Sequence, residues 1–277
     1  MERITKPLLT KALKDLGLTL GDTVLVHSDL RLFGKPEHCE SREEILRFYL
    51  SAIQEIIGTE GTLAVPAYFY EYARYGIPFD VDSSPVSLSL GSFSSYICRL
   101  PGRIRSCNPL QSIASIGGRA QELSGSLSLS GYGVCSPWHH LRMMGGKMLF
   151  LGVSMQPMTY VHYIEQQYGV PHLYLKIYPQ TVIKNGKPLI GNPVSAVRYL
   201  DYGIEYDISP FEQILKSSEK ALFTTIGKGM LSLVDASIAY DEGIRQLDKN
   251  IFFFLKKPPD FIPGRIPFDG ITGAQKS

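Results

Sequence analysis

The chain has 277 residues, of which 44% are hydrophobic and 19% are charged, a composition typical of a globular protein with a large apolar core. Its formal net charge of +2, without a dense run of lysine and arginine, argues against a nucleic-acid scaffold. No apolar run approaches the ~20 residues needed to span a bilayer. The N-terminal "MERITKPLLTKALKDLG" mixes charged with apolar residues, unlike a secretory signal. The sequence therefore predicts a cytoplasmic protein.

Strands and helices alternate through the first half of the chain. An amphipathic N-terminal helix leads to a short β-branched strand, Thr23 to Val26. The next helix begins with the capping box of Ser41 and Glu44 and ends at Gly58. A buried strand and a long aromatic loop follow, at 61–68 and 68–85. Further helices are predicted within 89–102, 135–146 and from 159 onward, with strands within 103–117 and 147–153.

The pattern changes from about Leu173. An Asn-Gly dipeptide between apolar runs, Asn185–Gly186, predicts a β-hairpin. Helices are predicted over 209–221 and 231–250, and the apolar "IFFFL" at 251–255 is predicted as a last strand. These elements predict a single domain over residues 1–277, an α/β sandwich with a mixed, largely parallel central sheet and antiparallel additions.

Cysteines and histidines form no recognisable metal motif. The four cysteines are widely separated without a C-x-x-C pair, and the adjacent His139 and His140 have no ligand-like partner nearby in the sequence. Neither Cys107 nor Cys135 lies in a nucleophile-elbow motif. The sequence therefore predicts no bound metal and no covalent cysteine intermediate.

His162 and Glu165 are the strongest candidates for acid–base chemistry. They lie three residues apart in "TYVHYIEQQYGVPH", so both side chains project from one face if the segment is helical. An imidazole beside a carboxylate can accept a proton near neutral pH. A polar pair that only holds the helix to its neighbours remains the alternative.

Polar residues also follow the first strand, in "VHSDLRLFGKP". His27, Ser28, Asp29 and Arg31 lie where the strand ends, and ligands bind at that edge of parallel α/β sheets. A turn that satisfies its own backbone groups would produce the same pattern.

A basic turn and a glycine-rich loop are two candidate anion sites. "GRIRSCNPLQS" carries Arg105, Ser106 and Ser112, which suit phosphate contacts, although a solvated basic turn explains them equally well. "GYGVCSPWHH" leads into a helix N-terminus but is neither a P-loop nor a dinucleotide fingerprint, so a nucleoside triphosphate or NAD is not expected. Trp138, the single tryptophan, either packs in the core or stacks on a ligand.

Several segments in this order resemble the aminoglycoside 3-N-acetyltransferase (antibiotic N-acetyltransferase) family. They are "GDTVLVHSDLRLFG", "GTEGTLAVPAY", "PGRIRSCNPLQSIASIGGRAQEL", "GVCSPWHHLRMMGGKMLFLGV" and "TYVHYIEQ", and the similarity runs from about Gly21 to Leu247. The resemblance implies a fold unrelated to the common GNAT acetyltransferases. It also implies transfer of an acyl group from a coenzyme A thioester to an amine of a sugar.

The resemblance also assigns residues. The family element T-x-x-H-x-x-E falls on Thr159, His162 and Glu165, which implies His162 as the base and Glu165 as the residue that orients it. The element H-S-x-L implies a wall for coenzyme A, formed with the basic turn by His27, Ser28, Asp29, Leu30, Arg31, Arg105, Ser106 and Ser112. The predicted acceptor-binding residues are Tyr68, Tyr70, Glu71, Asn108 and Thr159.

Two departures from the family pattern shape the predicted substrate. Asn108 replaces a histidine that is usual in the family, and no charge occurs between Ser124 and Cys135. Because aminoglycosides are polycations, a site for them should be acidic. The prediction is therefore an acyl-CoA-dependent N-acyltransferase that acts on a nucleotide-linked amino sugar for surface polysaccharide synthesis, with acetyl or a larger acyl group.

Two alternatives remain: an aminoglycoside 3-N-acetyltransferase that confers antibiotic resistance, and a non-catalytic coenzyme A-binding or scaffold protein. In either enzymatic case the expected co-substrate is acyl-CoA and the acceptor is a small amino sugar. No nucleic acid or membrane partner is expected, and a homo-oligomer is compatible with the sequence.

Overall fold

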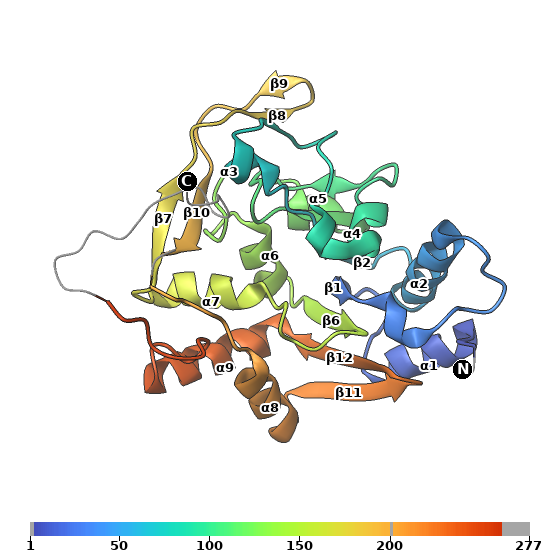
Figure 1. The fold of residues 1–277 in the computed structure, drawn as a ribbon. Helices are drawn as coiled ribbons and strands as arrows, with labels where there is room; N and C mark the ends of the chain where they lie inside the picture. Colours follow the sequence, from blue (N-terminus) through green and yellow to red (C-terminus); the bar gives the residue numbers. More distant parts are fainter. Residues whose placement is uncertain (1–2, 200–201, 262–277) are drawn as a thin grey trace.

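The computed structural model describes residues 3–199 and 202–261 (Figure 1). Its centre is a sheet of seven strands: β1 (Thr23–Ser28), β2 (Thr62–Pro66), β4 (Ile104–Arg105), β5 (Ile113–Gly117), β6 (Lys147–Leu151), β11 (Ala221–Ile226) and β12 (Gly229–Asp235). The spatial order is β11-β12-β6-β1-β2-β5-β4. β1 pairs in parallel with β2 and β6, and the outer strands pair antiparallel. The predicted mixed α/β sheet is confirmed, but among the described strands only the two central pairings are parallel and the other four are antiparallel, so the sheet is not largely parallel.

Helices cover both faces of this sheet and bury two separate apolar cores. One face packs against α1 (Lys6–Asp15), α2 (Arg42–Ile57) and α4 (Gly91–Ile97). The other packs against α5 (Ala120–Ser124), α6 (Pro137–Met143), α7 (Tyr160–Tyr168), α8 (Ser209–Ser217) and α9 (Ala236–Lys249). Strand side chains alternate between the two cores, as Val24 and Val26 do with Leu25. No described helix is long and apolar enough to cross a membrane.

Local capping signals are confirmed where they were predicted. Ser41 accepts the backbone N–H of Glu44, and the Glu44 carboxylate accepts the N–H of Ser41, so the capping box at α2 is complete. Ser136 accepts the N–H of His139 at the start of α6, directly before Pro137.

Smaller elements lie outside this sheet. They are η1 (Leu30–Phe33), α3 (Glu71–Tyr75), β3 (Phe79–Asp80), η2 (Leu88–Leu90), β7 (Leu173–Ile177), β8 (Val182–Lys184), β9 (Lys187–Pro188) and β10 (Val194–Arg198). The predicted hairpin joins β8 to β9, with φ of 51° at Asn185 and 70° at Gly186, the positive values that Asn-Gly turns adopt. β7 pairs antiparallel with β10. The predicted loop over 68–85 contains α3 and β3.

Two predictions in the C-terminal part were wrong. The segment predicted as a helix over 231–250 starts within β12, whose central residues are buried. Helix α9 begins only at Ala236, with Asp235 as its N-cap. A short apolar run is compatible with either a buried strand or a helix, so periodicity could not separate them. The strand predicted at 251–255 consists of turns, and only Leu255 makes a β-bridge, with Tyr206.

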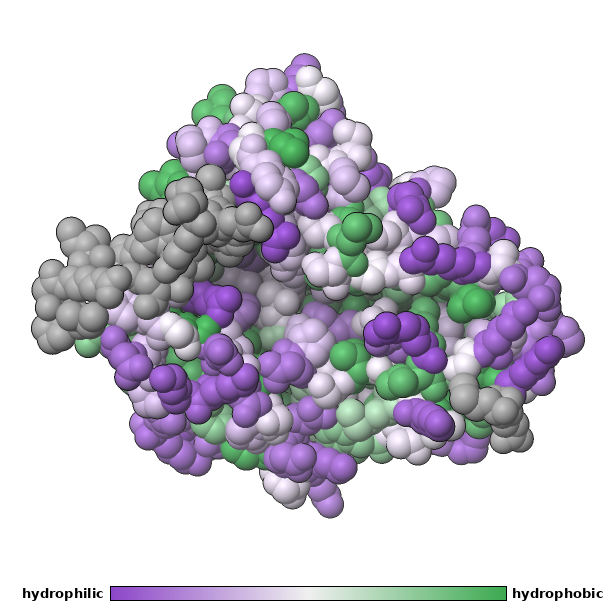
Figure 2. All heavy atoms as spheres, in the orientation of Figure 1, coloured by the Kyte–Doolittle hydropathy of each residue, from purple (hydrophilic) through white to green (hydrophobic). Residues whose placement is uncertain are grey.

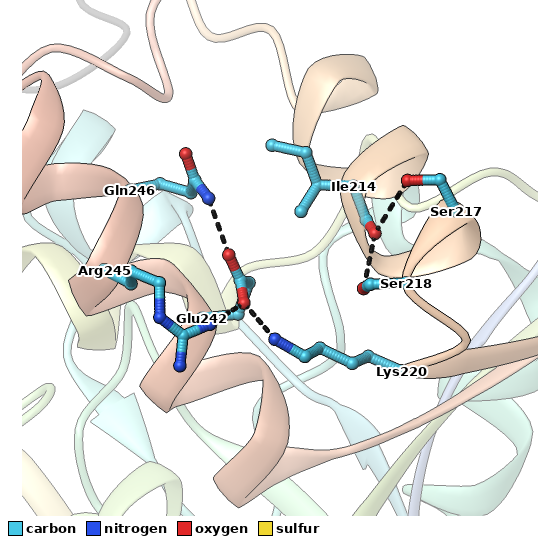
Figure 3. A network of polar contacts seen from close by, with 7 residues as sticks. All are labelled: Ile214, Ser217, Ser218, Lys220, Glu242, Arg245 and Gln246. Atoms are coloured by element: carbon cyan, nitrogen blue, oxygen red, sulfur yellow. Dashed lines mark hydrogen bonds and ion pairs between the residues drawn. The ribbon is translucent and has the colours of Figure 1, made fainter.

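A network of charged and polar side chains connects α9 to the segment just before β11 (Figure 3). The Glu242 carboxylate is almost fully buried and accepts hydrogen bonds from Lys220, Arg245 and Gln246. Lys220 lies between α8 and β11, and its backbone N–H donates to the carbonyl oxygen of Leu215 at 2.9 Å. The network therefore joins α8, β11 and α9 on the side of the sheet that also carries α7.

Candidate functional site

The centre of the candidate site is the first turn and a half of α7. Thr159 occupies the N-cap position, and Gly169 ends the helix with φ of 87°, in the left-handed region that glycine adopts readily. As the spacing predicts, His162 and Glu165 share one helix face, with Nδ1 of His162 3.1 Å from Oε2 of Glu165. The His162 side chain is 31% exposed, and that of Glu165 is fully buried.

This contact determines which nitrogen of His162 is available for chemistry. A carboxylate only accepts hydrogen bonds, so Nδ1 of His162 carries the proton and Nε2 retains its lone pair. Burial by itself raises the pKa of Glu165, but the hydrogen bonds from His162 and His172 and the charge interactions with these two rings together outweigh it, so the pKa lies below its usual value. Glu165 therefore stays ionised and orients the imidazole of His162, which in its neutral form can accept a proton through Nε2.

Two further residues contact Glu165, and the sequence analysis missed both. His172 places Nε2 2.8 Å from Oε1, and Tyr206 donates its hydroxyl to Oε2 at 3.0 Å. His172 lies just beyond α7, at the end of "TYVHYIEQQYGVPH". Its closeness to Glu165 in the sequence was the one signal that could have pointed to this contact. Tyr206 comes from the segment before α8, for which no local pattern exists.

His162 stands where two cavities meet. The larger has a volume of about 600 Å³ and the smaller about 310 Å³. Five residues line both: Tyr68, Tyr70, Thr159, His162 and Tyr206. Figure 2 shows the molecule hollowed near the middle of this face. Two ligands that enter from different sides could thus reach the same imidazole.

The larger cavity has a polar and mainly cationic rim. Its charged side chains are those of Arg74, Arg198, Lys256 and Glu205. Lys256 and Glu205 form an ion pair of 2.6 Å, and the guanidinium of Arg74 lies over the ring of Tyr70, 5.3 Å from its centroid. Tyr132 and Gln111 complete its polar wall.

The structure brings three of the five predicted acceptor residues to the cavities: Tyr68, Tyr70 and Thr159. Glu71 and Asn108 are not among the described residues that line either cavity. Glu71 accepts a hydrogen bond of 2.9 Å from Ser87. Asn108 is buried and its amide donates to the carbonyl oxygen of Leu129 at 2.8 Å, so it holds the surrounding loops together. Both side chains are thus engaged with protein groups, and their contact with an acceptor stays a prediction.

The predicted coenzyme A residues at the end of β1 and just after it lie outside both described cavity walls. His27 is buried and stacks on Phe150, with ring centroids 5.1 Å apart. Asp29 and the exposed Arg31 form a 2.5 Å ion pair with each other. The backbone of Ser28 lies beside the start of α4, and η2, which ends just before α4, contributes Leu90 to the smaller cavity. Leu30 begins the short helix η1.

The basic turn has a structural role in this molecule. Arg105 is only 3% exposed, and its guanidinium donates to the carbonyl oxygens of Ala67, Ser84 and Pro85. Ser112 also donates to the Ala67 carbonyl, at 2.6 Å, and the Ser106 hydroxyl accepts the N–H of Ile113. Because these polar groups already have buried partners, the phosphate contacts predicted for them have no support in the geometry.

The cysteines and histidines lie apart in the fold as well. All four cysteines are free thiols, and only Cys135 is exposed. Within residues 3–199 and 202–261, no group of three or more His, Cys, Asp or Glu side chains could hold a metal ion. The absence of a metal remains a prediction.

Burial of His27 leads to a prediction for acid stability. Burial lowers the pKa of His27 from its ordinary 6.5 to about 4, so between these values the unfolded chain binds a proton that the folded chain does not. Stability from this group is complete above pH 6.5 and falls by about 3 kcal/mol as the pH drops to 4. His27→Phe keeps a flat ring against Phe150 but cannot titrate. We expect its free energy of unfolding to rise relative to that of the wild type by about 3 kcal/mol as the pH falls from 6.5 to 4.

The measurement is urea unfolding of both proteins from pH 4 to pH 9. The difference between their free energies of unfolding should stay constant above pH 7 and change only below it. A difference that is constant down to pH 4 would show that His27 titrates alike in the folded and unfolded chains.

Comparison with known proteins identifies relatives. A sequence model of one family, described as aminoglycoside 3-N-acetyltransferase, matches residues 25–248. An aminoglycoside N(3)-acetyltransferase III from Salmonella sp is 27% identical over 184 residues, 61% of this chain and 62% of that protein. An aminoglycoside N(3)-acetyltransferase IX from Micromonospora chalcea is 25% identical over 258 residues, 86% of this chain and 88% of that protein. The match thus spans less than two thirds of the type III relative.

A solved structure shares the fold. It is described as AAC-IIIb in a binary state with CoASH, and it matches with a TM-score of 0.76 at 23% identity, covering 93% of this chain and 100% of that chain. Likeness at this identity shows a common α/β fold. The resemblance inferred from the sequence motifs is confirmed, and the predicted coenzyme A co-substrate agrees with the molecule bound in that structure.

The predicted nucleotide-linked acceptor was wrong. The family model and both relatives are described as aminoglycoside acetyltransferases, which was the alternative in the sequence analysis. The prediction relied on the net charge and on the uncharged loop between Ser124 and Cys135. Net charge describes the whole surface, whereas acceptor choice depends on the few groups beside His162.

Proposed function

The chain belongs to the aminoglycoside 3-N-acetyltransferase family, and we propose that it transfers an acetyl group from acetyl-CoA to an amine of an aminoglycoside. The observation that carries this proposal is the contact between His162 and Glu165 at the junction of two cavities. Such a junction holds two substrates against one base, which favours direct transfer between them. A buried carboxylate behind a partly exposed imidazole also favours catalysis over the non-catalytic binding alternative.

His162 acts as the general base in the proposed reaction. After the acceptor ammonium loses one proton to solvent, its nitrogen attacks the thioester carbonyl while Nε2 of His162 takes the second proton. The new C–N bond forms, the C–S bond breaks, and the electron pair leaves on sulfur. The imidazolium then passes its proton to the thiolate, so the products are an amide and a free thiol. Glu165 stabilises the imidazolium and keeps Nδ1 protonated throughout.

We place the thioester arm of acetyl-CoA in the smaller cavity. Acetyl-CoA supplies an activated acyl group and a good leaving group. The wall of this cavity combines apolar side chains with a few polar ones: Ser89, Leu90, Gln156, Met158 and Val161. An arm of methylene groups interrupted by amides suits such a wall, because each part finds a matching surface. The larger cavity is then left for the acceptor.

In its described part, the larger cavity does not have the acidic lining expected of a site for a polycation. The tyrosines of the larger cavity offer ring faces and hydroxyls to a sugar, and Glu205 offers a carboxylate. Arg74 and Arg198 on the same rim repel ammonium groups. We therefore expect weak acceptor binding, with a KM that falls as pH rises and the acceptor loses charge.

The direct test is release of thiol from acetyl-CoA with a panel of aminoglycosides, using wild type and His162→Ala. We expect acceptor-dependent release by the wild type, and NMR of the product should place the acetyl group on the amine at position 3. Thiol release that needs no aminoglycoside, or that His162→Ala supports equally, would contradict the proposal.

A further inference from the structure

We propose that His172 is a positioning residue for this transfer, one that acts through Glu165 without touching either substrate; the inference rests on the proposed function. Nε2 of His172 lies 2.8 Å from Oε1 of Glu165, and both side chains are fully buried. Neither described cavity wall includes His172. Its role is to hold the carboxylate in the orientation and charge state that His162 requires.

The end of α7 brings His172 back to Glu165. The backbone N–H groups of Gly169 and Val170 both donate to the carbonyl oxygen of Glu165, at 2.9 Å and 3.3 Å. This turn reverses the chain, because Gly169 adopts a positive φ. His172 therefore returns beside the residue that the helix has just passed, although it lies beyond the helix itself.

The two oxygens of Glu165 have different partners. Oε2 is shared by His162 at 3.1 Å and Tyr206 at 3.0 Å. Oε1 is held by His172. Without that donor, Oε1 would be a buried carboxylate oxygen with no partner among the described residues, which is costly. The carboxylate could then rotate, and the contact with Nδ1 of His162 would no longer be fixed.

The other described neighbours of the His172 ring are aromatic rings. Its Nδ1 is buried with no hydrogen-bond partner among the described residues. Its ring lies 5.9 Å from that of Phe252 and 6.2 Å from that of Tyr206. An apolar ring would pack equally well here and would bury no unpaired nitrogen. The single polar contact with Glu165 is therefore the chemical reason for a histidine at this position.

His172 also acts on the ionisation of Glu165. Burial raises the pKa of Glu165, and the hydrogen bonds from His162 and His172, with the charge interactions of the same two rings, lower it by more. Among the described residues, four titratable groups face this carboxylate: His162 from α7, His172 from the turn, Tyr206 from the segment before α8, and Tyr132 from the loop before α6. Burial raises the pKa of both tyrosines, so they stay neutral. Loss of His172 should therefore raise the pKa of Glu165.

The test compares wild type with His172→Phe and His172→Gln. Phenylalanine keeps the ring volume and removes the donor, whereas glutamine keeps an N–H donor. For His172→Phe we expect kcat to fall about 10-fold, the effect of one hydrogen bond to a charged group. The acid limb of the kcat/KM profile should move to higher pH, with the KM of both substrates almost unchanged. His172→Gln should restore most of kcat and return the acid limb toward wild type.

A second measurement does not depend on turnover. The ¹³C resonance of the Glu165 side-chain carboxyl, assigned with Glu165→Gln, should titrate at higher pH in His172→Phe than in wild type. An unchanged titration and an unchanged rate profile would overturn the inference. Equal losses of kcat in both variants without any pH shift would also overturn it, since they would indicate a packing role. If the Glu165 titration shifts in His172→Phe but the wild-type protein transfers no acetyl group to any aminoglycoside, the proposed function is refuted and the contact between His172 and Glu165 stands.

Discussion

His162→Ala is expected to lower kcat by about 10²- to 10⁴-fold, the usual contribution of a positioned general base. The loss should fall mainly on kcat, because proton transfer to Nε2 occurs only as the new C–N bond forms. Steady-state kinetics with acetyl-CoA and an aminoglycoside acceptor measure it.

His139→Ala is the matched control for this experiment. His139 is another partly buried imidazole, with Nδ1 3.0 Å from the hydroxyl of Tyr163, but it lies on α6 and outside both described cavity walls. Its removal should leave turnover near that of the wild type. Equal losses in the two variants would mean that His162 supports the fold and does not act as the base.

Trp138→Ala is expected to lower the free energy of unfolding by about 4 kcal/mol, because it empties a large, fully buried site. Trp138 packs against Tyr132 and Tyr160, and its indole N–H donates to the carbonyl oxygen of Gln111 at 2.9 Å. The melting temperature should fall by roughly 10 °C. Circular dichroism in urea and on heating measures both, since the variant lacks the tryptophan fluorescence.

Trp138→Phe separates packing from the hydrogen bond in this prediction. It keeps an aromatic ring, so it should lose about half as much stability as Trp138→Ala. The alanine variant should also weaken acceptor binding, because Tyr132 and Gln111 line the larger cavity. A stable alanine variant with a normal KM would contradict the core role and revive a ligand-stacking role for Trp138.

Local sequence was sufficient for features that depend on a few neighbouring residues. The capping box of Ser41 and Glu44 and the turn at Asn185 form as predicted, because both rely on hydrogen bonds and φ values within one turn. The spacing of His162 and Glu165 likewise predicted their contact, since residues three apart share a helix face. Where local sequence suits two structures, as at β12, the prediction failed.

What the sequence determined by itself was therefore the family, the mixed α/β class and the histidine–carboxylate pair. Only the tertiary structure decided which other groups complete the site. It brings Tyr206 from a distant segment to Glu165, and it buries Arg105 among backbone carbonyls although its sequence context suggested phosphate binding. The physical reason is that burial and long-range contacts depend on how separate segments pack, and no local spacing encodes which segments will meet.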